Sequence, residues 1–316
     1  MSKRSDGFYA GIDSGGTKCE VLIASENITG SISGKILFKR SYKGVHYSVA
    51  GLKLYSEKVS GFIKNSIASA KLDLKNCRGI CLGVAGARED NDRKKLKSSF
   101  QRILGFKDVL VTTDAMTALY GAFEGDEGII LISGTGSVLY GFSKGKLTRI
   151  GGWGRIIGDE GSGYWIGKRA LNLLMKEYEK GDGGKSMLAK KVYNKFGIDH
   201  RNVVEKVFNE NFEIQLLAPL VIECAEKKCG LSLKIVNEAV DGLIQDIKTF
   251  IKVSKRKRSI NIAFIGSIIE NRNILSDKLK REINKLKIVK VVPKKHSSSY
   301  GAVLLASENS PIINKL

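Results

Sequence analysis

The sequence has no apolar run that approaches the roughly 20 residues a membrane-spanning helix needs. Its first residues, MSKRSDGFYAGID, also lack the apolar core of a secretory signal, since a predicted strand and turn follow directly. Both absences predict a cytoplasmic protein with no membrane partner. The chain has 316 residues, of which 42% are hydrophobic, so it is long and apolar enough for two globular domains.

Cysteine is sparse, and its spacing excludes the common metal-binding frameworks. The five cysteines show no paired spacing of the kind that holds zinc. We expect them to be small core or surface residues with reduced thiols, as is usual in the cytoplasm. They are Cys19, Cys77, Cys81, Cys224 and Cys229.

Acidic residues are few relative to basic ones, with 32 Asp and Glu against 53 Lys and Arg, so the formal net charge is +21. Residues 248–295 alone carry 15 Lys and Arg and three Asp and Glu, which is +12 of that total. A basic segment can bind nucleic acid or another acidic surface. This one has no interleaved aromatic residues, zinc ligands or helix-turn-helix pattern. We therefore interpret it as a solvated face that attracts anionic substrates, and we do not expect nucleic acid as a partner.

The first motif that carries chemistry follows the N-terminal strand. Residues 8–13 and 19–24 read as two strands joined by SGGTK, a tight hairpin with two glycines at its tip. The loop is too short for a Walker A motif and no helix follows it. Its backbone N–H groups could surround a phosphate, and Asp13 could hold a divalent metal directly or through water. A plain structural hairpin is the alternative.

A second loop of the same kind lies near the middle of the chain. Residues 128–145 again read as strand, Gly/Ser/Thr tip and strand, with SGTGS at 133–137. This weak self-similarity predicts two related halves, each with one phosphate loop. The glycine cluster GGWG and the run GDEGS at 158–162 come next, and their Asp-Glu pair offers carboxylates to hydroxyl groups or a metal. The whole stretch is suited to hold a phosphorylated group beside a polyhydroxylated one.

Single polar or small residues follow two further predicted strands. Asp114 ends the strand 109–113, at the edge of the sheet where ligands bind in open α/β proteins. It is either a general base or the N-cap of the helix that begins at 115, and spacing alone does not decide between them. Gly266 ends the strand 260–265 and either admits a nucleotide base or ribose or makes an ordinary turn.

The remaining pattern alternates strands and helices and then becomes almost entirely helical after Gly158, as far as residue 252. Further strands are predicted at 36–40, 79–84 and 288–292. Helices are predicted at 49–70, 88–104, 185–196, 201–208, 213–228, 232–251, 272–286 and 297–306.

In this order, the motifs resemble the N-acetylglucosamine kinase family, in the BadF/BadG/BcrA/BcrD-type ATPase branch of the actin/hexokinase superfamily. The resemblance covers nearly the whole chain and is most specific between residues 131 and 165. It implies an α/β fold with two actin-like (ribonuclease H-like) lobes, mixed sheets flanked by helices and an active site in the interlobe cleft. It implies an N-terminal lobe of residues 1–115 plus the C-terminal helix 300–316, and a C-terminal lobe of residues 116–299 with a helical insertion.

The resemblance also implies an ATP- and Mg²⁺-dependent sugar kinase in which Asp114 is the general base and Asp13 lies beside the metal. The implied ATP-binding residues are Asp13, Gly15, Gly16, Thr17 and Lys18 in the first loop, Gly134, Thr135, Gly136 and Ser137 in the second, and Gly266 and Ser267 beside the adenosine. The implied sugar contacts are His46, Asp114, Gly152, Trp153 and Asp159.

The sequence departs from the family pattern at two positions, so the identity of the sugar substrate is not decided. Members of the family usually carry Asn near position 45 and after the second phosphate loop, where this chain has Val45 and Val138. We expect an N-acetylhexosamine, N-acetylglucosamine or N-acetylmannosamine, or a hexose; a broad-specificity glucokinase is the alternative. An ATPase that activates a dehydratase or reductase is a weaker one, because no cysteine lies near the second phosphate loop. The size of the insertion favours a homodimer.

Overall fold

The computed structural model describes residues 7–26 and 35–307. The chain divides into two compact units, one formed by residues 1–126 with 294–316 and the other by residues 127–293. The division expected from the sequence fell at 115–116 and 299–300, and its last stretch, 308–316, lies outside the described residues. The helix that begins at Asp114 packs with the C-terminal helix and therefore belongs to the first unit.

A five-stranded mixed sheet forms the centre of the first unit, in the order β3-β2-β1-β4-β5. Strand β1 pairs antiparallel with β2 and parallel with β4, which in turn pairs parallel with β5. The strands are β1 (Phe8–Ser14), β2 (Lys18–Ser25), β3 (Ile36–Lys43), β4 (Cys77–Val84) and β5 (Val109–Thr113). The parallel strands β1, β4 and β5 thus end at one edge, which is where side chains meet a ligand in α/β proteins.

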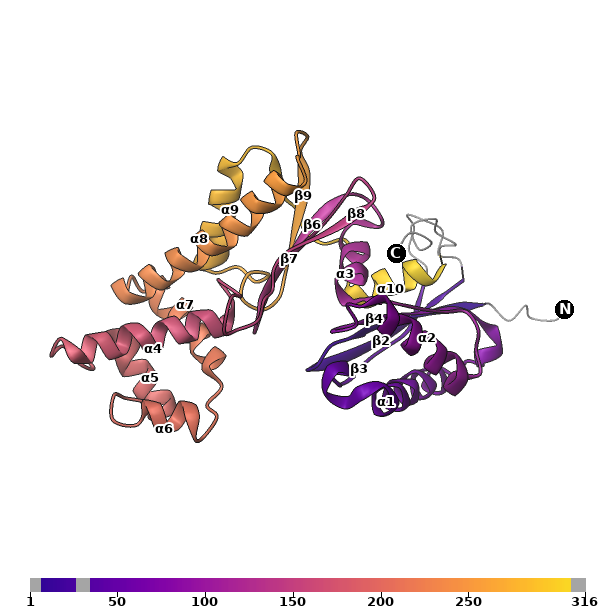
Figure 1. Cartoon of the computed structure of the whole chain (residues 1–316), viewed down its shortest axis with the longest axis horizontal. Coiled ribbons are helices and arrows are strands. Elements are labelled where there is room, and N and C mark those ends of the chain that lie inside the picture. The colour runs from indigo at the N-terminus through magenta and orange to yellow at the C-terminus, as the bar shows by residue number, and fades with distance from the viewer. Residues whose placement is uncertain (1–6, 27–34, 308–316) are drawn as a thin grey trace. The chain divides into compact units, whose positions relative to one another are not determined.

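Alternation along the strands produces two covered faces. Phe8, Ala10 and Ile12 on β1 join the buried core with the helices α1 (Tyr47–Ser69) and α2 (Asp90–Leu104). The opposite face carries α3 (Asp114–Phe123) and the C-terminal α10 (Ser298–Ser307), which is yellow in Figure 1. Gly11 permits that contact, since a Cβ there would lie 2.2 Å from the carbonyl oxygen of Ser299.

The second unit repeats this strand plan. Its sheet has the order β10-β9-β6-β7-β8, and β6 pairs antiparallel with β7 and parallel with β9. The strands are β6 (Gly128–Ser133), β7 (Ser137–Ser143), β8 (Lys146–Gly151), β9 (Ile260–Ile265) and β10 (Val289–Val291). Strands β6 to β10 therefore correspond in order and direction to β1 to β5, which agrees with the self-similarity seen in the sequence.

Helices between β8 and β9 form most of the second unit. They bury a continuous apolar core with β6, β7 and β9, and α8 packs against β7 and β8. The helices are α4 (Gly163–Glu179), α5 (Met187–Phe196), α6 (Val203–Phe208), α7 (Ala218–Glu226), α8 (Gly230–Val253) and, after β9, α9 (Ile274–Lys285), with the 3-10 turn η2 (Ile214–Leu217) before α7. In the first unit, the 3-10 turn η1 (Leu74–Asn76) precedes β4.

Three local predictions were wrong in detail. Strand β8 was not predicted because its sequence, KLTRIG, has no strong apolar alternation. The helix predicted at 213–228 is divided into η2 and α7, since Pro219 suits the first turn of a helix. The helix α1 contains a kink at Gly51, whose φ of 72° is outside the helical range.

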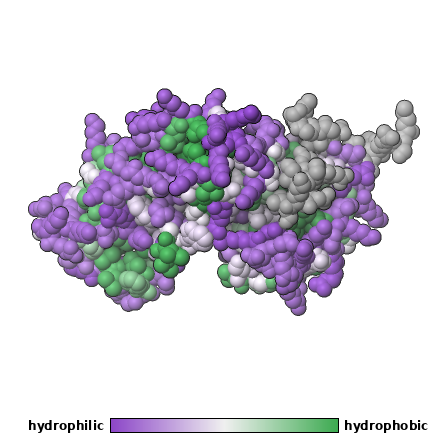
Figure 2. All heavy atoms as spheres, turned by 45° about the horizontal axis from the view of Figure 1, so that its top comes forward, coloured by the Kyte–Doolittle hydropathy of each residue, from purple (hydrophilic) through white to green (hydrophobic). Residues whose placement is uncertain are grey.

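The face drawn in Figure 2 is mostly hydrophilic, with separate hydrophobic areas. Exposed large apolar side chains include Trp153, Ile156 and Ile157 in the loop after β8 and Val204 and Phe208 on α6. Among the described residues, no helix is both long and apolar enough to cross a membrane.

Candidate functional site

In the first unit, backbone hydrogen bonds from two glycines fix the hairpin tip between β1 and β2. Gly15 N donates to Lys18 O at 2.9 Å, and Gly44 N donates to Thr17 O at 2.9 Å. A Cβ on Gly44 would lie 2.4 Å from Lys18 N, so only glycine allows β3 to end this close to the tip. Gly16, Thr17 and Lys18 remain exposed at the tip.

His46 fits between this tip and the loop that follows β4. A Cβ on Gly16 would lie 3.0 Å from His46 Cδ2, and one on Gly86 would lie 3.4 Å from His46 Cε1. His46 is also the N-cap of α1, but its side chain makes no capping hydrogen bond. The imidazole is exposed at the carboxyl edge of the first sheet and does not cap the start of the helix.

Asp13 and Asp114 flank the end of β4 at the same edge. Asp13 pairs in register with Gly83 on β4, and Thr113, the residue before Asp114, pairs with Val84. Burial raises the pKa of Asp13 to about 7, with further contributions from the negative charges of Asp114 and Glu20. Two carboxylates in one partly dehydrated site, where the charge of Asp114 raises the pKa of Asp13, are suited to a cation or to proton transfer.

The structure excludes the N-cap interpretation of Asp114. Thr113 is the N-cap of α3, and its hydroxyl accepts a hydrogen bond from Met116 N at 3.2 Å. Asp114 is the first residue of the helix. Burial raises its pKa, against the opposing effects of the N–H groups of Ala115 and Asp114 itself and of the Arg88 and His46 side chains. A carboxyl group with a raised pKa is the kind that accepts protons efficiently near neutral pH.

Glu20 is a polar centre that the sequence did not reveal. The residue is only 8% exposed, and its carboxylate accepts hydrogen bonds from Lys18 Nζ at 2.7 Å and Ser299 Oγ at 2.6 Å. Lys39 Nζ lies 3.1 Å away. Burial opposes its ionisation, but the hydrogen bonds from Lys18, Ser299 and Lys39 outweigh burial and lower the pKa of Glu20 to about 2. This anion fixes Lys18 and joins three segments that are distant in the sequence.

In the second unit, the tip between β6 and β7 is held from two sides. Ser137 Oγ donates to Glu160 O at 2.7 Å and Gly163 N donates to Gly134 O at 2.7 Å. On the other side, Ile268 N donates to Ser133 O at 3.1 Å. The hydroxyl of Ser137 is thus engaged in holding the loop, while Gly134 has open space where a Cβ would point. This arrangement suits close approach of an anion to the backbone.

Asp159 is the best-anchored acidic side chain beside that tip. It is 8% exposed and its Oδ1 accepts a hydrogen bond from Gly154 N at 3.0 Å. Gly136 makes room for it, because a Cβ there would lie 2.7 Å from Asp159 Oδ2. Asp246 of α8 is a second residue that sequence reasoning missed, and burial together with Glu160 and Asp159 raises its pKa to about 6.

The segment 151–153 presents both backbone and an aromatic ring. Gly152 contacts Val138, and its carbonyl accepts a hydrogen bond from Arg149 Nη2. The Arg149 guanidinium carbon lies 5.2 Å from the centre of the Trp153 ring, a cation–π contact. Trp153 is 70% exposed, so its ring can cover a ligand without first leaving a core.

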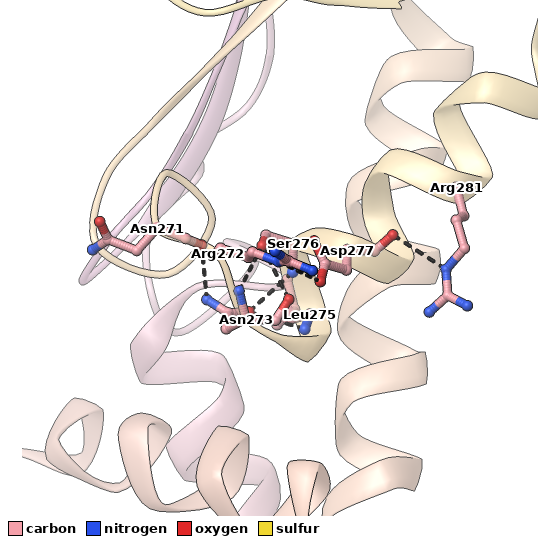
Figure 3. A network of polar contacts seen from close by, with 7 residues as sticks. All are labelled: Asn271, Arg272, Asn273, Leu275, Ser276, Asp277 and Arg281. Carbon is pink, nitrogen blue, oxygen red and sulfur yellow. Dashed lines mark hydrogen bonds and ion pairs between the residues drawn. The ribbon is translucent and has the colours of Figure 1, made fainter.

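Gly266 and Ser267 follow β9 directly beside the second tip. Gly266 has a φ of 102°, and a Cβ there would lie 2.4 Å from Ser133 O, so the close contact requires glycine. The helix α9 then begins with a capping box. Asn273 accepts from Leu275 N and Ser276 N, and Ser276 Oγ accepts from Asn273 N at 3.0 Å (Figure 3). Ser267 remains exposed.

The predicted site residues therefore form one group in each unit. In the first unit the hairpin tip, Asp13, His46 and Asp114 lie at the carboxyl edge of the sheet. In the second unit the tip, Gly152, Asp159 and Gly266 lie around the end of β6. Each group combines a glycine-rich turn between antiparallel strands with carboxylates.

The chain belongs to the BadF/BadG/BcrA/BcrD ATPase family, which it matches over residues 10–306. It is 31% identical to the N-acetylmuramic acid/N-acetylglucosamine kinase of Clostridium acetobutylicum, over 95% of this chain and 98% of that protein. It is 28% identical to the N-acetyl-D-glucosamine kinase of Dictyostelium discoideum, over 90% of this chain and 91% of that one.

Solved structures share the fold. A Chromobacterium violaceum protein, provisionally assigned as an N-acetylglucosamine kinase, has a TM-score of 0.77 at 24% identity, over 96% of this chain and all of that one. A ROK family glucokinase from Streptomyces griseus, in complex with glucose and AMPPNP, has a TM-score of 0.56 at 15% identity, over 95% of this chain and 98% of that one. The predicted actin-like α/β fold with two mixed sheets flanked by helices is confirmed.

Proposed function

We propose that the protein is an ATP-dependent kinase of amino sugars, with N-acetylated hexosamines such as N-acetylglucosamine as substrates. The proposal depends above all on Asp114, a carboxylate with a raised pKa that is not used as a helix cap. The relatives named as amino-sugar kinases match almost the whole chain and support the same activity. In the reaction a sugar hydroxyl attacks the γ-phosphorus of ATP, and a sugar phosphate and ADP are the products.

Asp114 accepts the proton of the attacking hydroxyl in this proposal. Its position at the first turn of α3 keeps the carboxylate near backbone N–H groups, and its raised pKa increases its basicity once it is ionised. Phosphoryl transfer otherwise needs charge neutralisation and in-line positioning. We assign those tasks to Gly15, Gly16, Thr17 and Lys18 in one loop and to Gly134, Thr135, Gly136 and Ser137 in the other.

The donor set fits a Mg²⁺ ion that arrives with the nucleotide. Among the described residues, no group of three or more His, Cys, Asp or Glu side chains could hold a metal alone. Mg²⁺ commonly binds through one or two carboxylates together with phosphates and waters. Asp13, whose pKa is raised to about 7 by burial and by Asp114 and Glu20, is a carboxylate whose ionised form a cation would stabilise. When bound, the ion would neutralise phosphate charge.

We assign sugar contacts to His46, Gly152, Trp153 and Asp159, and adenosine contacts to Gly266 and Ser267. Asp159 offers a fixed acceptor for hydroxyl groups, and the exposed Trp153 ring offers an apolar surface for a sugar face. The proposal includes a cytoplasmic location, supported by the five free cysteines. It also includes a homodimer, supported by the large helical insertion and by the exposed Val204 and Phe208 on α6.

A coupled ADP-release assay tests the proposal. Purified protein is supplied with ATP, with and without Mg²⁺, and with N-acetylglucosamine, N-acetylmannosamine, glucosamine or glucose. We expect Mg²⁺-dependent ADP release with at least one N-acetylated amino sugar. Faster turnover of glucose than of every amino sugar would support the glucokinase alternative, and an absence of sugar-dependent ADP release would refute the proposal.

A further inference from the structure

The carboxylate of Glu20 divides its two oxygens between two kinds of partner. Oε1 accepts a hydrogen bond from Ser299 Oγ at 2.6 Å and lies 3.1 Å from Lys39 Nζ. Oε2 accepts from Lys18 Nζ at 2.7 Å and from Ser41 Oγ at 3.5 Å. The bond from Ser41 is long and therefore weak. One oxygen thus joins the sheet to α10, whereas the other is engaged mainly by the lysine of the hairpin tip.

The two partners of Oε1 already compensate for the burial of Glu20. Lys39 supplies the opposite charge from β3, the strand that pairs with β2. Ser299, which is fully buried on α10, supplies a neutral donor. A buried carboxylate is costly without a counter-ion and donors, and these two residues provide both. The fold therefore does not require Lys18 as a further partner of Glu20.

Lys18, by contrast, depends on Glu20 for the order of its side chain. The Lys18 side chain is 60% exposed, and among the described residues Glu20 is its only ion-pair partner. A lysine that is free in solvent loses rotamer freedom when a ligand immobilises it, which weakens binding. An ammonium has three donors, so the bond to Oε2 leaves two for a ligand. Glu20 thus orders Lys18 in advance without using all of its donors.

Strand geometry places this pair on the same face of the sheet as Asp13. Lys18 and Glu20 are two residues apart on β2, so their side chains leave the same face. Glu20 also pairs in register with Asp13 on β1, and cross-strand partners share a face. Glu20 therefore lies between the ammonium that we assign to phosphate and the carboxylate that we assign to the cation.

We propose that Glu20 is a positioning residue for the nucleotide: it holds the Lys18 ammonium at the hairpin tip in the orientation that meets the phosphates of ATP. Glu20 itself contacts neither the nucleotide nor the sugar. The inference rests on the proposed function, because it takes this tip as a phosphate loop. It goes beyond that function by giving a buried residue outside the loop a part in nucleotide binding.

The test measures the affinity for ATP by isothermal titration calorimetry with Mg²⁺ present, so that the sugar need not be known. Glu20→Gln keeps the size of the side chain and an oxygen that can accept from Ser299, but its amide nitrogen cannot accept from Lys18. Charge alone would make this variant bind ATP more tightly, since an anion is removed near a polyanion. Positioning predicts the opposite, and we expect Kd for ATP to rise about 3- to 10-fold.

A double-mutant cycle shows whether Glu20 acts through Lys18. Lys18→Gln should raise Kd for ATP about tenfold or more. Adding Glu20→Gln to it should cause no further loss, because the side chain that Glu20 positions is gone. An equal loss in both backgrounds would overturn the inference, and so would unchanged or tighter binding of ATP by the single variant Glu20→Gln.

Ser299→Ala is the matched control, because it removes a neutral partner from the other oxygen of the same carboxylate. It should lower the unfolding temperature and leave Kd for ATP at the wild-type value. A loss of affinity as large as that of Glu20→Gln would show that the fold is responsible and would also overturn the inference.

A second variant keeps the test decisive if Glu20→Gln does not fold. Glu20→Asp keeps the charge but withdraws the carboxylate from Lys18 by one methylene, so it should weaken ATP binding in the wild-type background and not in Lys18→Gln. Equal losses in the two backgrounds would again contradict positioning. A wild type that binds no ATP would instead refute the proposed function, on which the inference rests.

Discussion

The two units share one order and direction of strands, but they differ in the charged residues at the ends of those strands. In the first unit, β1 ends with Asp13 and Ser14, and a lysine follows in the tip. In the second, β6 ends with Ile132 and Ser133, and the tip of Gly134, Thr135 and Gly136 is uncharged. Both serines make a buried hydrogen bond, but in opposite roles: Ser14 Oγ accepts from the Tyr55 hydroxyl at 2.7 Å, whereas Ser133 Oγ donates to Gly161 O at 2.8 Å.

The neighbouring parallel strands differ in the same way. After β4 and β5, the first unit places Arg88 and Asp114, whereas β9 and β10 of the second lead to Gly266 and Pro293. The common plan thus gives each unit a glycine-rich turn, which we propose binds phosphate. Proton transfer and metal binding are proposed for the first unit alone, and the second contributes backbone donors and the anchored Asp159. The comparison predicts that substitutions in the two units will have different consequences.

Replacement of Asp114 should have the largest effect on catalysis. Asp114→Ala deletes the proposed base, and we expect kcat to fall by about 10²-fold or more. The helix should persist, because Thr113 and not Asp114 provides the cap of α3. Steady-state kinetics with saturating ATP and sugar measure the loss, and circular dichroism checks the fold.

Asp108→Asn is the control for Asp114→Ala, since Asp108 is exposed just before β5. It should retain near wild-type turnover. If Asp114→Ala kept more than about a tenth of the wild-type kcat with a native fold, the assignment of the base would be wrong.

Two glycines in the tip of the second unit should respond differently to a methyl group. A Cβ on Gly136 would lie 2.7 Å from the buried Asp159 carboxylate, so Gly136→Ala should displace Asp159 and cost about 2 kcal/mol of stability. We expect KM for the sugar to rise about tenfold as well. Thermal unfolding and sugar-dependent kinetics measure the two effects.

Gly134→Ala provides the comparison, because no atom lies within 4 Å of its Cβ position. The fold should tolerate it. If phosphate approaches this backbone as proposed, KM for ATP should rise while the unfolding temperature stays unchanged. Unchanged KM values for ATP in Gly134→Ala would count against a phosphate loop here.

The sequence revealed the hairpins and most helices because their signals are local. Alternation in FYAGIDS and the small residues of SGGTK and SGTGS are visible without the fold. Asp114 was visible as a polar residue at the end of an apolar strand. Its two interpretations could be separated only by the side chain of Thr113, which spacing does not report.

Residues whose partners lie far along the chain could not be predicted. Glu20 looks like an ordinary strand residue, but its partners come from Lys39 on β3 and Ser299 on α10. Asp246 lies within α8 and meets Glu160 and Asp159 only after the second unit has folded. The strand β8 was not predicted for a different reason, because a polar edge strand has little apolar periodicity.

The raised pKa of Asp246 predicts that the stability of the second unit depends on pH. Burial, Glu160 and Asp159 raise its pKa to about 6. Because the folded protein binds this proton more tightly than the unfolded chain, the ionised carboxylate lowers stability above about pH 6 and has no such effect below the unfolded pKa near 3.8. Asp246→Asn should therefore raise the free energy of unfolding at pH 8 by about 1–2 kcal/mol, and the gain should vanish near pH 4.

Tryptophan fluorescence follows this effect, because both tryptophans, Trp153 and Trp165, belong to the second unit. Urea unfolding of Asp246→Asn at the two pH values measures it. Asp241→Asn, an exposed change on the same helix, should show no comparable difference. A gain for Asp246→Asn that is as large at pH 4 as at pH 8 would mean that packing and not charge is responsible.

The smallest effects on stability come from two helix caps of the same kind, one in each unit. Thr113 Oγ1 accepts from Met116 N at 3.2 Å in the first unit, and Ser162 Oγ accepts from Trp165 N at 3.1 Å in the second. Replacing either by Ala should cost about 1 kcal/mol. Ser162→Ala should shift the urea transition seen by tryptophan fluorescence, whereas Thr113→Ala should shift the one seen by circular dichroism and leave fluorescence nearly unchanged. Equal shifts of both signals in both variants would show that the units unfold as one cooperative body, so that their separate stabilities could not be compared.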